Sequence, residues 1–217
     1  MKTIAVILSG CGNRDGSELQ ETLGLLLAID RHGFKYQCFA PQGSFKVVSY
    51  LDNDGETGEV RDLFAEAARI ARGDIRPLDE YLANDYAALA LPGGMGAARN
   101  LSTYAFDGTN MNVLPEVEKA ILDTHAAGKP VVAMCIAPIV LSKVMGHLGV
   151  KLTLGDICAA SRAAVAMGAN HEVCGPTDIC VDNANKVITT PAYMVATHIS
   201  QIFDGAENMI AKLSEWI

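Results

Sequence analysis

The chain has 217 residues, with 17 basic and 25 acidic side chains and a formal net charge of −8. Half of the residues are apolar and 19% are charged, which predicts a folded chain with a sizeable core. The negative charge argues against nucleic acid or an anionic membrane as a partner, because both need clustered lysine and arginine. The longest apolar run, residues 130–141, is too short to span a membrane.

The first residues form a strand-like run with no secretion or transit pattern, so we expect a cytoplasmic protein. In that setting, and with a large core, we expect free thiols rather than disulfides. The chain has six cysteines: Cys11, Cys38, Cys135, Cys158, Cys174 and Cys180. No C-x-x-C pair occurs, and His171 with Cys174 is only a weak metal pair, so we predict no metal site.

Short apolar runs alternate with helical patterns along the chain, which is typical of βαβ units and a parallel sheet. The predicted strands are residues 2–9, 36–40, 86–91, 131–134, 172–181 and 186–190. The first predicted helix has Leu19, Leu23, Leu26 and Leu27 at helical spacing and ends at Gly33 as its cap. The other predicted helices span about residues 115–127, 136–145 and 156–167, and a terminal helix begins at about Tyr193. The pattern predicts one doubly wound α/β domain over residues 1–217.

Residues 42–76 are less regular, and we interpret them as an excursion from the main sheet rather than a separate domain. They contain a strand-like run at 45–51, a turn through Asn53, Asp54 and Gly55, and a predicted helix from about Gly58 to Arg72.

Cys135 is the sharpest candidate for chemistry. In open parallel sheets, ligands bind outside the carboxyl ends of the strands, and Cys135 lies where a predicted strand passes into a helix. Ala133 and Ala137 stand two positions on either side, as the strained turn of a nucleophile elbow requires. The positive end of the helix dipole would favour a thiolate. The alternative is a buried cysteine packed as a small hydrophobic residue.

Two glycine-rich turns could complete such a site. Asp15 and Glu18 have the spacing of a capping box, and Glu18 could also point toward Cys135 and act as a proton donor and acceptor. Cys11 lies in the same turn and could line the pocket with Asp15, or it could be an ordinary buried thiol. A dinucleotide fingerprint is rejected, because Asp15 stands where its last glycine belongs, so we predict no cofactor.

The second turn contains Gly93 and Gly94. Their backbone N–H groups, with that of Ile136, could form an oxyanion hole, although the turn could also need glycine only for its backbone shape. None of the five histidines has a sequence context that makes it an obvious base for Cys135.

These motifs together resemble the ElbB-like proteins, a PfpI-type branch of the class I glutamine amidotransferase-like superfamily. The resemblance covers nearly the whole chain and rests on four segments. They are residues 7–18 with Gly10-Cys11-Gly12 and Asp15-Gly16-Ser17-Glu18, residues 92–98 with Pro92-Gly93-Gly94 and Gly96-Ala97-Ala98, residues 134–138 with Met134-Cys135-Ile136-Ala137-Pro138, and residues 188–194 with Ile188-Thr189-Thr190-Pro191-Ala192-Tyr193-Met194.

The resemblance implies a flavodoxin-like three-layer sandwich with helices on both faces of a mostly parallel sheet, and a homodimer. It also implies a lyase of glyoxalase type, which converts a small 2-oxoaldehyde such as glyoxal to a 2-hydroxy acid such as glycolate without glutathione or metal. Cys135 would form the hemithioacetal and Glu18 would act as acid and base.

The chain also departs from the superfamily. Ile136 stands where protease-like members have a histidine, and His171-Glu172 lacks the spacing of an amidotransferase His-x-Glu. Relatives with glyoxalase activity often present a histidine in the strand after the elbow helix, and residues 151–155 contain none. Two alternatives follow: a thiol-based redox sensor or interaction protein with little turnover, and a hydrolase of small amides or esters.

Overall fold

The computed structural model describes residues 1–51 and 55–217. The strands are β1 (Thr3–Ile7), β2 (Lys35–Ala40), β3 (Ser44–Val48), β4 (Glu56–Asp62), β5 (Ile75–Pro77), β6 (Ala88–Leu91), β7 (Val131–Met134), β8 (Lys151–Leu152), β9 (Asn170–His171), β10 (Cys180–Asp182) and β11 (Val187–Thr190). The helices are α1 (Leu19–Arg31), α2 (Leu63–Ile70), α3 (Gly96–Arg99), α4 (Tyr104–Asp107), α5 (Pro115–Ala126), α6 (Pro138–Met145), α7 (Ala159–Ala166) and α8 (Ile199–Ser214).

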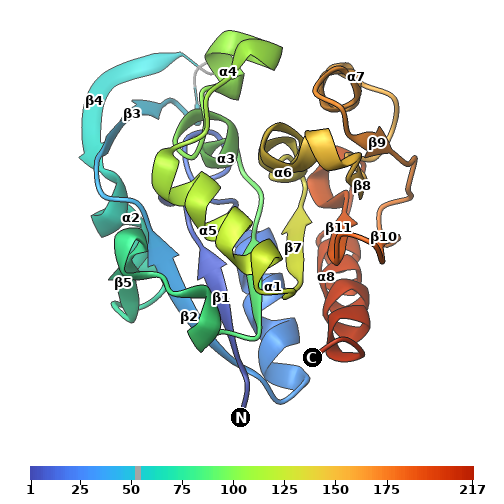
Figure 1. The fold of residues 1–217 in the computed structure, drawn as a ribbon. Helices are drawn as coiled ribbons and strands as arrows, with labels where there is room; N and C mark the ends of the chain where they lie inside the picture. The colour runs from blue at the N-terminus through green and yellow to red at the C-terminus, as the bar shows by residue number, and fades with distance from the viewer. Residues whose placement is uncertain (52–54) are drawn as a thin grey trace.

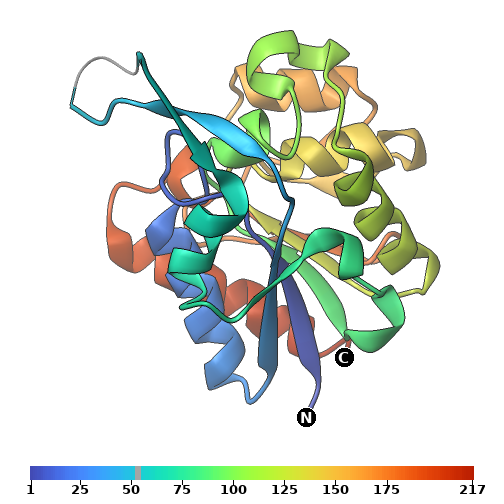
Figure 2. The same cartoon turned by 90° about the vertical axis from the view of Figure 1, so that its left-hand side faces the viewer.

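A seven-stranded sheet forms the centre of the molecule, in the order β10-β11-β7-β6-β1-β2-β5. Neighbouring strands run parallel except at the edge, where β10 pairs with β11 in the antiparallel direction. Helices α1 and α8 pack together on one face, while α5 and α6 cover the other (Figures 1 and 2). The predicted α/β fold with a mostly parallel sheet between helices is confirmed.

The central strands are buried from end to end, because helices cover both faces of the sheet. All four residues of β6, β7 and β11 are buried, and so are the last four of β1. Such strands appear in the sequence as continuous apolar runs, which is why the alternation of strands and helices could be predicted. The carboxyl ends of β1, β6, β7 and β11 meet at one edge of the sheet.

The described residues of 41–74 lie outside the main sheet, and the chain rejoins it at β5, an edge strand that was expected to belong to the excursion over 42–76. The local structure of this part also differs from the prediction. Strands β3 and β4 form a separate antiparallel hairpin, which extends beyond the body of the molecule (Figure 2). The predicted helix from Gly58 is therefore wrong up to Asp62, since pairing with β3 keeps this segment extended and Asp62 then caps α2. Of the predicted turn, Asn53 and Asp54 lie outside the described residues.

Two predictions near the end of the chain are also wrong. The expected strand over residues 172–181 is irregular until β10, because Gly175 and Pro176 begin a turn in which the carboxylate of Asp178 accepts a hydrogen bond from the Gly175 N–H at 2.8 Å. The expected helix from Tyr193 begins later. A 3₁₀ turn spans Ala192–Met194, and α8 follows from Ile199.

Candidate active site

A cavity of about 580 Å³ opens at the carboxyl ends of the central strands. Its walls come from the loop after β1, the start of α1, the loop after β6, the residues after β7 and the turn after β11. The lining residues are Asn13, Glu18, Gln20, Gly94, Met95, Cys135, Ile136, Tyr193 and Met194. This is the position expected for a ligand site in an open parallel sheet.

Cys135 lies directly after β7 with a left-handed backbone conformation, φ 60°. Its N–H donates to the carbonyl of Thr190 at 3.0 Å, which continues the pairing between β7 and β11 past the strand end. A non-glycine residue with positive φ is strained by about 1–3 kcal/mol and persists only where its surroundings hold it. Pro138 then begins α6, where the missing N–H of proline costs nothing because the first N–H groups of a helix have no acceptor within it. The expected elbow geometry is present.

The carboxyl that reaches the Cys135 thiol belongs to Glu21, in the first turn of α1. Glu21 is completely buried, and its Oε1 accepts a hydrogen bond from the N–H of Tyr193 at 3.2 Å. Its Oε2 has no hydrogen bond of standard geometry within the described ranges and lies against Gly93 and Cys135. Burial raises the pKa of Glu21 to about 8, so this carboxyl carries a proton at neutral pH.

Glu18 takes a different place from the one expected for it. Its carboxyl caps α1, with Oε2 accepting from the N–H of Glu21 at 2.6 Å, and its side chain lines the cavity instead of hydrogen-bonding to the thiol. The assignment of Asp15 as the cap is therefore wrong. Burial raises the pKa of Glu18, although N–H groups at the helix start oppose the shift.

The electrostatic environment of Cys135 favours a thiol over a thiolate at rest. Burial raises its pKa well above the ordinary value, and the charge of Glu21 adds to the shift. Hydrogen bonds from the N–H groups of Gly94 and Ile136 act in the opposite direction, since they stabilise a negative sulfur. The effect expected from the helix dipole is thus outweighed by burial and by the neighbouring carboxyl.

The two glycines after β6 have different roles. Gly94 has φ +97° and directs its N–H toward the sulfur. The N–H of Gly93 faces the Glu21 carboxyl instead, so Gly94 and Ile136 are the two donors left for an oxyanion. A methyl group at Gly93 would overlap both Glu21 Oε2 and Cys135 Cβ. Glycine at this position is what lets the acid and the thiol meet.

Cys11 and Asp15, both candidates for pocket lining, lie on the far side of their loop and do not belong to the cavity wall. The carboxyl of Asp15 accepts hydrogen bonds from the N–H of Val48 at 2.9 Å and from the hydroxyl of Tyr50 at 3.0 Å, which ties the β3–β4 hairpin to the loop. The half-buried Cys11 interacts electrostatically with Glu66 and Arg69 of α2.

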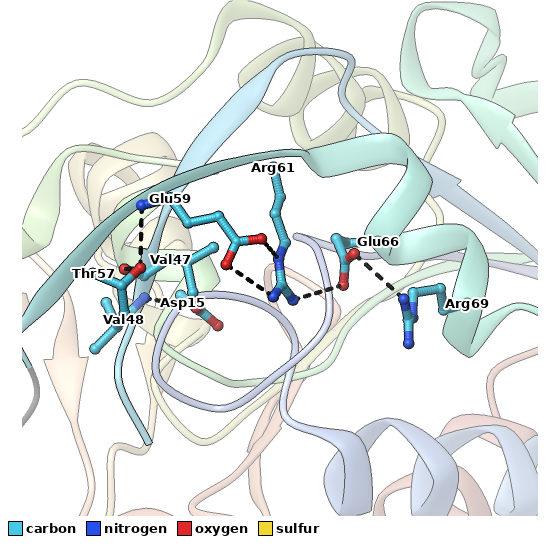
Figure 3. A network of polar contacts seen from close by, with 8 residues as sticks. All are labelled: Asp15, Val47, Val48, Thr57, Glu59, Arg61, Glu66 and Arg69. Carbon is cyan, nitrogen blue, oxygen red and sulfur yellow. Dashed lines mark hydrogen bonds and ion pairs between the residues drawn. The ribbon is translucent and has the colours of Figure 1, made fainter. Parts of the chain in front are cut away.

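Figure 3 shows that polar contacts continue from Asp15 across the hairpin to α2. Arg61 of β4 donates to Glu59 at 2.7 Å and lies 3.8 Å from Glu66, which in turn pairs with Arg69 at 3.7 Å. Exposed ion pairs of this kind contribute little stability individually. Their position shows that the hairpin and α2 form one outer layer over the loop that carries Asp15.

Several residues of the site were not predicted from the sequence, and Glu21, which lies beneath the cavity wall, is the most important of them. The periodicity of α1 does contain a signal for it, since Glu21 shares the buried face with Leu25 and Ile29. Leu19 and Leu23, which were used to place the apolar face, are 43% and 50% exposed. The other cavity residues without a predicted role are Asn13, Gln20, Met95, Tyr193 and Met194.

Among residues 1–51 and 55–217, no group of three or more histidine, cysteine, aspartate or glutamate side chains could hold a metal ion. Over the same ranges, no helix is long and apolar enough to cross a membrane.

No family model matches the chain. Its family is shown instead by comparison with individual known proteins. The rat mitochondrial ES1 protein homolog is 39% identical over 98% of this chain and 83% of its own length. The human mitochondrial glutamine amidotransferase-like class 1 domain-containing protein 3 is also 39% identical, over 98% of this chain and 82% of its own.

Solved structures agree with this relationship. An isoprenoid biosynthesis protein with an amidotransferase-like domain from Ehrlichia chaffeensis has a TM-score of 0.91 at 33% identity, covering 99% of this chain and all of that one. A glyoxalase III from Candida albicans shares the fold, with a TM-score of 0.61 at 17% identity over 97% of this chain and 96% of its own. The chain belongs to the family of ES1 and class 1 glutamine amidotransferase-like domain proteins.

Proposed function

We propose that the protein is a glutathione-independent glyoxalase that converts a small 2-oxoaldehyde such as glyoxal to a 2-hydroxy acid such as glycolate. One observation carries the proposal: the buried carboxyl of Glu21 faces the thiol of Cys135 at the base of a cavity, while two N–H groups point at the same sulfur. We assign the acid–base role to Glu21 instead of Glu18, because Glu21 contacts the thiol.

In the first step, the sulfur of Cys135 adds to the aldehyde carbon and forms a hemithioacetal. Glu21 is neutral at rest, so its carboxyl donates its proton to the aldehyde oxygen, the thiol proton passes to solvent, and the carboxyl of Glu21 is left ionised. The N–H groups of Gly94 and Ile136 stabilise the negative charge that develops on oxygen, and one well-placed donor contributes about 3–4 kcal/mol.

In the second step, the ionised carboxyl of Glu21 removes the proton from the former aldehyde carbon. An enediolate forms, the remaining hydroxyl proton moves to the neighbouring oxygen, and Glu21 returns its proton to the neighbouring carbon to give a 2-hydroxy thioester. Water then breaks the carbon–sulfur bond, which releases the 2-hydroxy acid and the thiol. A pKa of about 8 suits this work, because a general base is most effective when its pKa lies near the working pH.

The composition of the cavity favours this reaction over amide hydrolysis. The described residues of its wall include no histidine, whereas the amidotransferase mechanism needs one beside the cysteine. The isomerisation needs one group that can both take and give a proton, and Glu21 can do both. The likeness to a glyoxalase III concerns the fold and is consistent with the proposal.

The test measures glyoxal consumption and glycolate formation by purified protein without glutathione and in the presence of a chelator. We expect turnover by the wild type, loss of more than about 10²-fold in Cys135→Ala, and a loss of about 10²- to 10⁴-fold in Glu21→Gln. Cys158→Ala, which changes a thiol away from the cavity, serves as the matched control and should keep its activity. Equal rates for wild type and Cys135→Ala would refute the proposal.

A wild type that does not turn over glyoxal, but forms a stable Cys135 sulfinate with mild peroxide, would support a redox sensor instead. The homodimer and the cytoplasmic location stay predictions. Light scattering of the purified protein and localisation of the tagged chain test them, and the rat and human relatives are named as mitochondrial proteins.

A further inference from the structure

The wall of the cavity has an unbalanced charge. Its ionisable side chains are Glu18, Cys135 and Tyr193, and none of the described residues of the wall is lysine, arginine or histidine. A second carboxyl, that of Glu21, lies beneath it and carries a proton at neutral pH. An anion that enters therefore approaches the carboxyl of Glu18 and finds no cationic side chain among these residues, which is unfavourable in a partly desolvated site.

The basic residue next to this wall in the sequence is directed elsewhere. Arg14 follows the lining residue Asn13, but its guanidinium donates to the carbonyl of Ser49 at 2.7 Å and lies over the ring of Tyr50 at 5.4 Å. Both partners belong to the segment that follows β3. The guanidinium of Arg14 thus holds the loop after β1 to the segment that follows β3.

The rest of the wall is suited to an apolar substituent. Met95, Ile136 and Met194 contribute apolar surface, and the side chains of Asn13 and Gln20 provide amide groups. A volume of about 580 Å³ lies in the range of cavities that enclose drug-sized ligands. A two-carbon dialdehyde would leave most of this space unfilled.

We propose that Glu18 makes access to Cys135 charge-selective, so that the site takes uncharged 2-oxoaldehydes with an apolar substituent and rejects analogues that carry a carboxylate. Glu18 is held in place for this role, because its carboxyl caps α1 through the N–H of Glu21. The substrate class rests on the proposed function. The charge selectivity concerns only access to the sulfur and can be measured without turnover.

The test compares two alkylating probes of similar size, neutral iodoacetamide and anionic iodoacetate. With either probe the sulfur–carbon bond forms as the carbon–iodine bond breaks, iodide leaves and the thiol proton passes to solvent. Because the chain has five other cysteines, the reaction is followed on the Cys135 peptide by mass spectrometry. The ratio of the two rates is divided by the ratio for a small neutral thiol, N-acetylcysteine amide.

For the wild type we expect a normalised preference for iodoacetamide of at least about fivefold. Glu18→Gln removes the charge at nearly constant shape and should bring the ratio to within about twofold of the free thiol. Glu18→Asp keeps the charge and should keep the preference. A wild-type ratio equal to that of the free thiol, or an unchanged ratio in Glu18→Gln, would overturn the proposal.

A measurement on the unmodified protein covers the case in which Glu18→Gln fails to fold. In 1 M salt the screening length falls to about 3 Å, so the preference of the wild type should shrink, whereas a steric preference would persist. Persistence of the full preference would also overturn the proposal.

The substrate class is tested by comparing kcat/KM for glyoxal, phenylglyoxal and 4-carboxyphenylglyoxal, which keeps the reacting 2-oxoaldehyde and adds a carboxylate. We expect phenylglyoxal to exceed glyoxal severalfold and the carboxylated analogue to be at least about tenfold poorer than phenylglyoxal. Selective alkylation without any turnover would refute the proposed function and leave the charge selectivity intact. Equal turnover of phenylglyoxal and its carboxylated analogue would refute the charge selectivity and leave the proposed function intact.

Discussion

The carboxyl of Glu21 and the thiol of Cys135 face one another beneath the cavity, one from the first turn of α1 and the other from the strained residue after β7. Neither side chain could approach the other if residue 93 had a side chain. Because the two groups interact directly, they titrate as a coupled pair, so changing either residue alters the titration of the other.

The first prediction concerns Gly93→Ala. The added methyl group would overlap Glu21 Oε2 and Cys135 Cβ, so the acid and the thiol must separate. We expect kcat/KM to fall by about 10²-fold, as for a displacement of about 1 Å between reacting groups, and stability to fall by about 1–3 kcal/mol. Kinetics and urea unfolding measure the two effects. Gly55→Ala, where the methyl group meets open space, is the control.

The second prediction concerns stability against pH. The folded state holds the Glu21 proton more tightly than the unfolded state, since the pKa rises from 4.5 to about 8. Folding is therefore favoured at low pH, and this contribution is lost as pH rises from about 4.5 to about 8. Relative to Glu21→Gln, which cannot titrate there, the wild type should lose at most about 5 kcal/mol of unfolding free energy.

Urea unfolding at pH 5, 6, 7 and 8 measures this difference, with Glu118→Gln on an exposed face of α5 as the matched control. Parallel pH profiles for the wild type and Glu21→Gln would contradict the pKa assigned to Glu21.

The third prediction concerns the reactivity of the thiol. Burial and the charge of Glu21 raise the pKa of Cys135, so its alkylation by iodoacetamide should be slow at neutral pH and should rise only at alkaline pH. Glu21→Gln removes the neighbouring charge and should move the rise to lower pH. The pH midpoint of alkylation is the measurement, because it does not depend on how accessible the sulfur is. A midpoint near neutrality in the wild type would contradict this account.

The fourth prediction concerns the link between the β3–β4 hairpin and the loop after β1 that carries Asp15. Asp15→Asn weakens a buried acceptor of two hydrogen bonds, from Val48 and Tyr50, and should cost about 1–3 kcal/mol. Tyr50→Phe removes only one of these bonds and should cost about 1 kcal/mol. Hydrogen exchange of residues 44–48 should quicken more in the first variant than in the second. Equal exchange in both would show that Asp15 does not hold the hairpin.

The central strands and the elbow could be predicted from the sequence because their signals are local. Continuous apolar runs mark strands with both faces covered, and the small residues around Cys135 mark a turn too tight for larger ones. The strand β4 has no such signal. It is exposed along its whole length, and its pairing with β3 decides its conformation.

The acid of the site was missed because the apolar face of α1 was placed from Leu19, Leu23, Leu26 and Leu27. The side chains of Leu19 and Leu23 are exposed, whereas Glu21 points inward with Leu25 and Ile29. A carboxylate is seldom buried, so composition favours assigning it to the surface. Only the contact with a residue from a distant strand end shows that Glu21 belongs to the site.

The main-chain hydrogen bond from the N–H of Cys135 to the carbonyl of Thr190 continues the pairing of the sheet up to Cys135 itself. Insertions, deletions and substitutions in the surrounding loops would change which ligands the cavity can bind without moving the sulfur of Cys135. Such a scaffold separates the evolution of substrate choice from the evolution of reactivity, which is how one architecture can come to serve many metabolites.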